Sequence, residues 1–562
     1  MDESRQEAPM ERPGSPPGRA FFLLVLFCAL LLRLLPVFQH VMVDEPVILG
    51  NITTFFERRT IVPTHFDYPT FFSYLAALPT IATALLAPAF GSVRSAHEFL
   101  AYQVFESPIP YAPIRLTSVA LGWLSVYILY RLGRRHWDEL TGLLAASFLT
   151  ISISHIQRSA LGLPDAATAF FSCLTLYAAL SAMRAEGLRP WALAGVCAGL
   201  LTAAKYNGAL LLVCIPAAYG VALQRRGILL RPAQWRLLPM TLAAGACVAA
   251  FFVASPGWLI APGAFWKAFV YDCRHMQEGH IGFYGATYGR WLKQFWDVEK
   301  GLSVLFAAGW LFALLRPTGE RIVLALCALA GFAVIGGWRY GDAHYFLFLY
   351  PVFCLLAAVF CRSAVKRLPS GWRKWAAAGV LGACVVPSLA VAARNAVLSV
   401  AVEDNRDAAL KWIYHSIPPE AVIAKDPWYS PRLISHAEAA AWLNSPLKGF
   451  FAKELQKRAT YYVIDIAQQS PRTQMRFVFP ESLSAVPADF MVVSSWWHER
   501  FENPLPPPDN PSYEEDVAGR RFYRELFGAG KDSGWTRIGS FDSPVGPRVE
   551  IYGRSLNPRP GP

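Results

Sequence analysis

The sequence predicts a polytopic α-helical membrane protein that carries a small α/β domain outside the membrane at its C-terminal end. Three observations lead to this fold class. Of the 562 residues, 54% are hydrophobic and only 16% are charged, whereas soluble domains carry about 25% charged residues. Apolar runs of helical length recur from residue 20 to residue 395. After residue 396 the apolar runs become short and β-like, and they alternate with helical and proline-rich pieces.

The net charge of +12 is spread over short basic clusters between the apolar runs. This pattern is typical of the cytoplasmic loops of membrane proteins and not of a nucleic-acid-binding surface, so we expect no nucleic-acid partner. The cysteines lie mostly within or at the ends of apolar segments, and only Cys273 falls in a long polar loop. The sequence therefore predicts cysteines that pack as small apolar residues and not a disulfide framework.

The chain begins with a polar, proline-containing stretch, residues 1–19, which predicts a short cytoplasmic tail. The apolar run 20–38 follows. It is interrupted by Arg33 and Pro36, and no small-residue cleavage site comes after it. These features favour a first spanning helix over a cleaved signal peptide.

The next apolar run, residues 71–90, contains Pro79 and Pro88. A crossing here would turn the basic cluster at 131–135 away from the cytoplasm. We therefore predict an interfacial or re-entrant helix that packs over the membrane face.

From residue 112 onward the apolar runs alternate cleanly with loops, and with the first helix they make about eleven transmembrane helices. Arginines and lysines gather in every second loop, on the side of the N-terminal tail, so that side is predicted to be cytoplasmic. The predicted spans after the first are 112–131, 138–156, 164–183, 190–205, 206–224, 237–259, 302–316, 320–337, 344–362 and 375–395.

Three regions follow from these spans: a tail at 1–19, a transmembrane domain at 20–395 and an extracytoplasmic α/β domain at 396–562. The transmembrane domain includes a long first outer loop, residues 39–111. In the C-terminal domain a helix is predicted at 405–416, and β-like runs occur at 421–425, 460–466, 490–497 and 548–553.

Ionisable residues are concentrated in the outward loops, where acidic groups beside a membrane are costly unless they are paired, hydrated or functional. Asp44 and Glu45 come directly after the first helix. A solvated pair that caps a helix explains them equally well. In the functional interpretation, Asp44 is a general base that deprotonates an acceptor as it attacks a sugar carbon, and Glu45 supports it. One carboxylate suffices when the leaving group is a phosphate, unlike in glycoside hydrolases.

Arg158 and Lys205 lie near outer helix ends, where each can neutralise a lipid phosphate. The alternative is a snorkelling cation or a partner for Asp165. For Arg339 and His344, which flank a very short outward loop, the alternative is anchoring of this loop by the aromatic residues around them. The remaining candidates for the substrate pocket are His65, Asp67, Tyr68, Asp165, Arg339 and His344.

A metal site is the least supported interpretation. His275, Glu278 and His280 have no closed zinc-ligand spacing, and a divalent site needs three or four convergent ligands. We expect no metal and no other cofactor, with a divalent metal left as an alternative.

Five stretches in this order resemble the C-type (GT-C) membrane glycosyltransferases: DE at 44–45, HFDYPTFFSYL at 65–75, IQRSALGLPDAATAFF at 156–171, GLLTAAKYNGALLL at 199–212 and HYFLFLYPVFCLLAA at 344–358. Within that class the chain is similar to the family of dolichyl-phosphate-mannose protein mannosyltransferases, bacterial aminoarabinose transferases and lipopolysaccharide-core galacturonosyltransferases. The resemblance covers about residues 20–395 and implies a GT-C-like fold.

The resemblance implies a polyprenyl-phosphate sugar donor, an inverting transfer, a catalytic aspartate at Asp44, and Lys205 with Arg158 near the donor phosphate. The chain departs from the family at 65–69, where His-Phe-Asp-Tyr-Pro replaces a His-Pro-Pro-like stretch. This departure puts the likeness of the acceptor pocket in doubt.

The predicted function is therefore a membrane glycosyltransferase that moves a sugar from a polyprenyl-phosphate donor to an extracytoplasmic lipid, glycan or protein acceptor. The alternative is a transporter or flippase of lipid-linked molecules, which predicts ionisable residues near the bilayer midplane and paired broken helices. A non-catalytic scaffold for the C-terminal domain is a third interpretation. For a bacterial source we expect the cell inner membrane, with the N-terminus cytoplasmic and the C-terminal domain extracytoplasmic.

Overall fold

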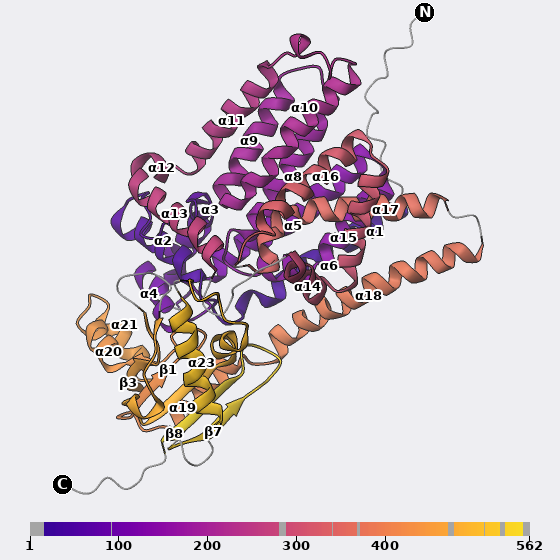
Figure 1. Ribbon diagram of the computed structural model, residues 1–562. Helices are drawn as coiled ribbons and strands as arrows, with labels where there is room; N and C mark the ends of the chain where they lie inside the picture. The colour runs from indigo at the N-terminus through magenta and orange to yellow at the C-terminus, as the bar shows by residue number, and fades with distance from the viewer. Residues whose placement is uncertain are drawn as a thin grey trace, which may run out of the picture.

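The computed structural model describes residues 16–91, 93–279, 288–339, 341–367, 371–469, 477–510, 512–528 and 534–554. A large helical body is joined to a smaller domain that contains strands, and the long helix α18 (Trp372–Ala401) leads from one to the other (Figure 1). The predicted fold class, a polytopic helical protein with a C-terminal α/β domain, is confirmed.

The helical body contains 18 α-helices, counted over the described residues. Their bounds are α1 (Pro16–Leu34), α2 (Glu45–Arg58), α3 (Phe71–Leu86), α4 (Ala96–Ala101), α5 (Ala112–His136), α6 (Glu139–Ile151), α7 (Ile153–Ser159), α8 (Asp165–Ala182), α9 (Arg189–Ala204), α10 (Cys214–Arg225), α11 (Leu238–Ala254), α12 (Gly257–Ile260), α13 (Pro262–Glu278), α14 (Tyr288–Glu299), α15 (Gly301–Leu315), α16 (Gly319–Ile335), α17 (Tyr350–Arg367) and α18. Short 3-10 helices are η1 (Leu35–Phe38), η2 (Ala87–Phe90), η3 (Tyr102–Phe105), η4 (Tyr206–Val213), η5 (Pro232–Gln234) and η6 (Ala343–Leu349).

Within the described residues, seven helices are long and apolar enough to cross a membrane, or eight if the bent pair α6–α7 forms one crossing. The sequence predicted about eleven. Four predicted spans are missing from these helices: α9, α11, α15 and α16 form at the predicted places but have 16, 17, 15 and 17 residues. The segment Phe71–Phe90, which was not counted as a span, is added to them. A full crossing needs about 20 residues, so these four helices fall short of it by length.

The segment Phe71–Phe90, formed by α3 and η2, is one of the seven by length and composition. It was predicted to lie at the interface or to re-enter. The helix packs against α2, α4, α5 and α9, and its interfacial placement stays a prediction.

The predicted span 138–156 is not one straight helix. It is broken at Ser152 into α6 and α7, which are bent by 64°. Arg33 of α1 donates to the carbonyl of Leu149 at 2.9 Å, at the end of α6. On the other side of the break, the Glu299 carboxylate accepts the backbone N–H groups of Ile153 at 3.0 Å and Ser154 at 2.9 Å.

Both charges at this break are fully buried. A cation at a helix C-terminus and an anion at a helix N-terminus are the favourable signs for the two half-helix dipoles. They also satisfy backbone groups that the break leaves without helical partners. The structure therefore stabilises the break from both sides.

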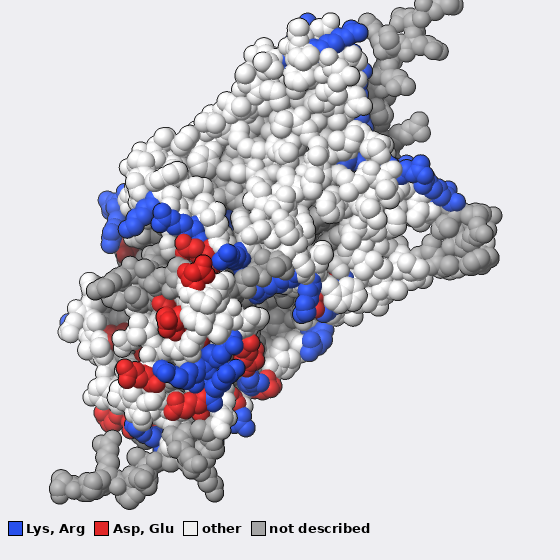
Figure 2. All heavy atoms as spheres, viewed as in Figure 1, with Lys and Arg blue, Asp and Glu red and all other residues white. Residues whose placement is uncertain are grey.

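Ion pairs join loops that the sequence placed on one side of the membrane. Glu320 lies 2.8 Å from both Arg184 and Arg225. Asp138 lies 2.7 Å from Arg362. These loops thus share one end of the body, as the alternation of spans requires. In Figure 2 the body is white over most of the visible face, whereas red and blue are mixed over the C-terminal domain.

The C-terminal domain is built on a mixed sheet of six strands in the order β2-β3-β1-β6-β8-β7. Strands β1, β2, β3 and β6 run parallel, and β8 with β7 adds an antiparallel edge. The bounds are β1 (Val422–Lys425), β2 (Ile434–Ser435), β3 (Thr460–Asp465), β6 (Phe490–Ser494), β7 (Trp535–Phe541) and β8 (Val549–Arg554), with a separate pair β4 (Gln468–Gln469) and β5 (Phe477–Val478). The helices are α19 (Asn405–Ser416), α20 (His436–Leu443), α21 (Lys448–Leu455), α22 (Ser495–His498) and α23 (Tyr513–Gly528), with 3-10 helices η7 (Leu483–Ala485) and η8 (Glu499–Glu502).

The domain docks on the first outer loop through an aromatic cluster. Phe105 from the loop meets Trp442, Phe450 and Phe451 from the domain, with ring centroids 5.3 to 6.4 Å apart. Arg432 also donates to the backbone carbonyl of Val104 at 3.0 Å. This contact holds the domain beside the segment that carries Asp44.

Candidate active site

Asp44 occupies the position just before α2, and its side chain makes no capping hydrogen bond to that helix. The side chain is exposed. The prediction left open whether Asp44 is a helix cap or a functional carboxylate. Because the carboxylate does not cap α2, it is available to other groups.

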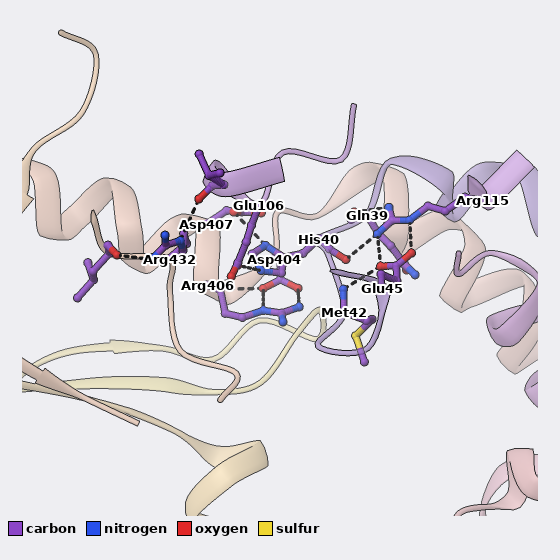
Figure 3. Close-up of polar contacts among 12 residues, drawn as sticks. Gln39, His40, Met42, Glu45, Glu106, Arg115, Asp404, Arg406, Asp407 and Arg432 are labelled. Atoms are coloured by element: carbon purple, nitrogen blue, oxygen red, sulfur yellow. Dashed lines mark hydrogen bonds and ion pairs between the residues drawn. The ribbon is translucent and has the colours of Figure 1, made fainter. Parts of the chain in front are cut away.

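Glu45 has the opposite environment, since it is fully buried. The guanidinium of Arg115 binds it through two hydrogen bonds of 2.7 and 2.6 Å (Figure 3). The carboxylate also accepts the backbone N–H groups of Gly162 at 2.7 Å and Met42 at 2.8 Å. Glu45 therefore fixes the chain on either side of Asp44, and its predicted catalytic role in support of Asp44 stays a prediction.

Arg115 extends the same network to the segment before Asp44. Its guanidinium donates to the carbonyls of Val37 and Gln39, each at 2.7 Å. The sequence analysis missed Arg115. The signal was an arginine inside the apolar run 112–131, since a cation in such a run is costly unless it has partners.

The two predicted phosphate-binding cations both have acidic neighbours. Lys205 lies 2.8 Å from Asp165, as the alternative interpretation expected. Its ammonium also lies over the rings of Tyr68 at 5.6 Å and Tyr345 at 5.2 Å. An ammonium has three donors, so the pair with Asp165 leaves Lys205 able to bind a further anion.

Arg158, in the last turn of α7, contacts His344 Nδ1 at 2.7 Å and Asp342 at 3.4 Å. Burial alone would raise the pKa of Asp342, but His344 and Arg158 outweigh burial and hold it below its ordinary value. Asp342 thus stays ionised and orients the guanidinium. The break between α6 and α7 gives α7 its direction and so places Arg158.

Carboxylates from distant parts of the chain converge around Tyr68. Burial raises the pKa of Tyr68, and the charges of Asp44 and Asp165 raise it further. Burial likewise raises the pKa of Asp67, to which Asp44 also contributes, against the opposing effect of His65. Burial and the charge of Asp67 raise the pKa of Asp272 to about 7. Asp44, Asp67 and Asp165 therefore share one electrostatic environment.

Two of the predicted pocket residues, His65 and Arg339, are held by hydrogen bonds of their backbone groups. Asn51 holds the backbone of His65 with hydrogen bonds of 2.9 and 3.1 Å, so His65 is positioned by the loop and α2. Arg339 is exposed, and its backbone N–H donates to the carbonyl of Met276 at 2.9 Å. Within the described residues, no ion pair links the Arg339 side chain to the other candidates.

In the part of the chain that the structure describes, no group of three or more His, Cys, Asp or Glu side chains is arranged to hold a metal ion. His275 stacks on Tyr271 with centroids 5.9 Å apart. His280 lies outside the described residues. The expectation of no metal therefore stays a prediction.

The model of the dolichyl-phosphate-mannose-protein mannosyltransferase family matches residues 100–258. That range includes Arg115, Arg158, Asp165 and Lys205, but not Asp44. The predicted resemblance to the C-type membrane glycosyltransferases is confirmed over this range. No curated protein matches the chain.

Several solved structures are similar to the chain, some of them over most of its length. The oligosaccharyltransferase AglB from Archaeoglobus fulgidus, in complex with an inhibitory peptide and a dolichol-phosphate, is 12% identical with a TM-score of 0.49, covering 94% of this chain and 80% of that one. ArnT from Cupriavidus metallidurans bound to undecaprenyl phosphate is 14% identical with a TM-score of 0.47, covering 97% and 98%. The S. cerevisiae Pmt1-Pmt2 complex bound to the sugar donor is 16% identical with a TM-score of 0.31, covering 51% and 37%. At TM-scores below 0.5 these likenesses carry no further conclusion.

Proposed function

We propose that this chain is an inverting membrane glycosyltransferase that moves a sugar from a polyprenyl-phosphate donor to an extracytoplasmic acceptor, with Asp44 as the general base. The observation that carries the proposal is the surroundings of Tyr68: the ammonium of Lys205 lies 5.6 Å from its ring centroid, and the charge of Asp44, from a distant segment, raises its pKa. The charge of Asp44 also acts on Arg158, which comes from a third segment. The family match over residues 100–258 supports the same reaction class.

In the proposed reaction an acceptor hydroxyl or amine attacks C1 of the donor sugar from the face opposite the phosphate. As the new C1 bond forms, the C1–O bond to the phosphate breaks and the polyprenyl phosphate leaves with both electrons of that bond. Asp44 takes the acceptor proton. A positioned general base of this kind contributes about 10²–10⁴-fold to the rate.

Arg158 and Lys205 stabilise the charge that develops on the leaving phosphate. Because each is already fixed by a carboxylate or an imidazole, little reorganisation is needed when the charge appears. The phosphate departs without a proton, and a second acidic group is not required. Tyr68 and Tyr345 surround the ammonium and limit the access of water to it.

The transporter alternative predicts paired broken helices. Among the described residues there is one bent pair, α6 and α7. Its two charges, Arg33 and Glu299, bind the helix ends that meet there. The single fixed break favours a rigid catalytic frame over alternating access.

The Asp44→Asn variant tests the proposal. In proteoliposomes with a polyprenyl-phosphate-linked sugar and a membrane extract as acceptor, transfer should fall by about 10²-fold or more, because the amide cannot accept the proton. Glu57→Gln, an exposed acid on α2, is the matched control and should transfer normally. Full activity of Asp44→Asn would remove Asp44 from the mechanism, and movement of intact donor across the bilayer without sugar transfer would favour the transporter.

A further inference from the structure

A cavity of about 320 Å³ lies between the segment that carries Asp44 and the C-terminal domain. One wall is formed by His40, Glu106 and residues 41–43 and 46. The other wall is formed by Arg406, Lys425, Pro427 and residues 428–432. Ligand cavities of this size commonly occur at domain interfaces. A group bound here lies directly beside the segment from which Asp44 projects.

The charged lining of the cavity is predominantly basic. Arg406, Lys425 and Arg432 line it together with His40, against a single carboxylate, Glu106. The acidic partners of the three cations do not line the cavity: they are Asp404 at 2.9 Å, Asp465 at 3.2 Å and Glu438 at 2.7 Å. These pairs fix the cations, and the donors that remain can bind an anionic group in the cavity.

Two aromatic side chains, Trp428 and Tyr429, complete the lining. Tyr429 has a φ of +64°, in the left-handed region that residues other than glycine rarely adopt. Arg500 fixes it by donating to the Tyr429 hydroxyl at 3.1 Å. Strained backbone of this kind persists where the surroundings determine it, and it is concentrated at binding sites.

We propose that this cavity is the acceptor subsite and that it takes a sugar ring bearing a carboxylate or phosphate group. The proposal rests on the proposed function, because the acceptor role follows from the position beside the segment that carries Asp44. The anion fits the basic side chains, and the ring fits the aromatic pair. The small volume suits a sugar unit of a glycan or glycolipid head group and not a folded protein surface.

Binding of soluble probes to the purified chain in nanodiscs, measured by titration calorimetry, tests the chemistry. Digalacturonic acid and glucose 6-phosphate should bind, and neutral cellobiose at least about tenfold more weakly, since a charge-assisted hydrogen bond has that magnitude. Equal binding of cellobiose, or tighter binding of an acidic peptide, would overturn the proposal. Nanodiscs containing an acidic glycolipid distinguish a lipid head group from a free glycan as the source of the sugar. Competition between this lipid and the soluble acids indicates a head group, and a lack of competition indicates a free glycan.

Lys425→Met tests the location. It should weaken binding of both acids by about tenfold, while Lys453→Met, an exposed lysine on α21, should bind like the native chain. Thermal unfolding of both variants shows whether they are folded. A folded Lys425→Met chain with native affinity would place the anion elsewhere and overturn the proposal.

The Asp44→Asn variant separates this inference from the proposed function. It should bind the acids normally while losing transfer. If transfer depends on Asp44 but no acid binds, the proposed reaction stands and the acceptor subsite is wrong. If the acids bind but the native chain transfers no sugar to any acceptor, the cavity is a binding site without the acceptor role, and that role is overturned.

Discussion

At the scale of single residues, the adjacent acids Asp44 and Glu45 have different environments. Asp44 is exposed and does not cap α2. Glu45 is buried, and it accepts two hydrogen bonds from Arg115. The buried pair fixes the direction of the chain, and the neighbouring carboxylate is the proposed general base. Positioning of this kind matters because small displacements of a catalytic group reduce the rate strongly.

Arg115→Lys tests the positioning role. A lysine keeps the charge but cannot form the two-pronged contact with Glu45 or reach the carbonyls of residues 37 and 39. We expect a loss of about 3 kcal/mol in the free energy of unfolding and a lower rate of transfer. Thermal unfolding and the transfer assay measure both. Arg135→Lys, an exposed residue of the same helix, should behave like the native chain.

His40 provides a prediction of pH dependence at the contact between loop and domain. It lies 3.1 Å from Asp407 and 3.5 Å from Glu106, and Arg406 is the other charge that faces it (Figure 3). Burial alone would lower the pKa of His40, but the hydrogen bonds to Asp407 and Glu106 outweigh burial and raise it above 6.5. A raised pKa stabilises the folded state fully below the unfolded value, and this contribution is lost as pH rises through the folded value.

We therefore expect the docking of the C-terminal domain to weaken as the pH increases beyond about 6.5. The melting temperature, measured across this range, should fall more steeply for the native chain than for His40→Gln. His415→Gln, an exposed histidine of α19, is the control and should keep the native profile. An identical profile for native chain and His40→Gln would show that His40 does not titrate at this contact.

At the scale of elements, the break between α6 and α7 determines where Arg158 lies. Buried Arg33 and Glu299 bind the two helix ends that meet there. An isolated charge in this environment would be costly in free energy. Each of these two charges is stabilised by the backbone groups of the helix end that it binds. A straight helix through 138–156 would have carried Arg158 in a different direction.

Glu299→Gln tests this element. A glutamine has one acceptor oxygen and an NH₂ group in place of the second, so one backbone donor of α7 loses its partner. We expect a loss of about 1–3 kcal/mol in stability and, because α7 places Arg158, a higher KM for the donor. Thermal unfolding and donor titration measure these effects. Asp297→Asn, exposed on the same helix α14 with its pair to Lys293, should change neither.

At the scale of the whole molecule, the C-terminal domain forms part of the cavity at the first outer loop. The aromatic cluster around Phe105 and the ionic contacts of His40 and Arg432 hold it against the first outer loop. One wall of the cavity at the segment that carries Asp44 belongs to this domain. In the proposed role of this cavity, the acceptor is selected by two parts of the chain that are far apart in sequence.

Phe450→Ala tests the docking. Phe450 is only 8% exposed and packs against Phe105 and Tyr102, so its truncation should cost about 3–5 kcal/mol. Limited proteolysis should cut the loop–domain contact region faster than in the native chain. Leu443→Ala, with 43% exposure on α20, is the control. Native protease resistance of a folded Phe450→Ala chain would mean that the cluster does not hold the domain.

The sequence by itself determined the membrane class, the places of most helices, four strands of the C-terminal domain (β1, β3, β6 and β8) and the candidates Asp44, Arg158 and Lys205. These follow from hydrophobic period, loop charge and local motifs, which are all short-range signals. Only the tertiary structure decided that Glu45 is buried against Arg115, that α6 and α7 are separate, and that the domain forms one wall of a cavity at the segment that carries Asp44. The partners concerned are 70 residues apart for Glu45 and Arg115 and 146 for Ile153 and Glu299. Hydrophobic period and local motifs cannot pair such residues, because packing of the whole chain brings them together.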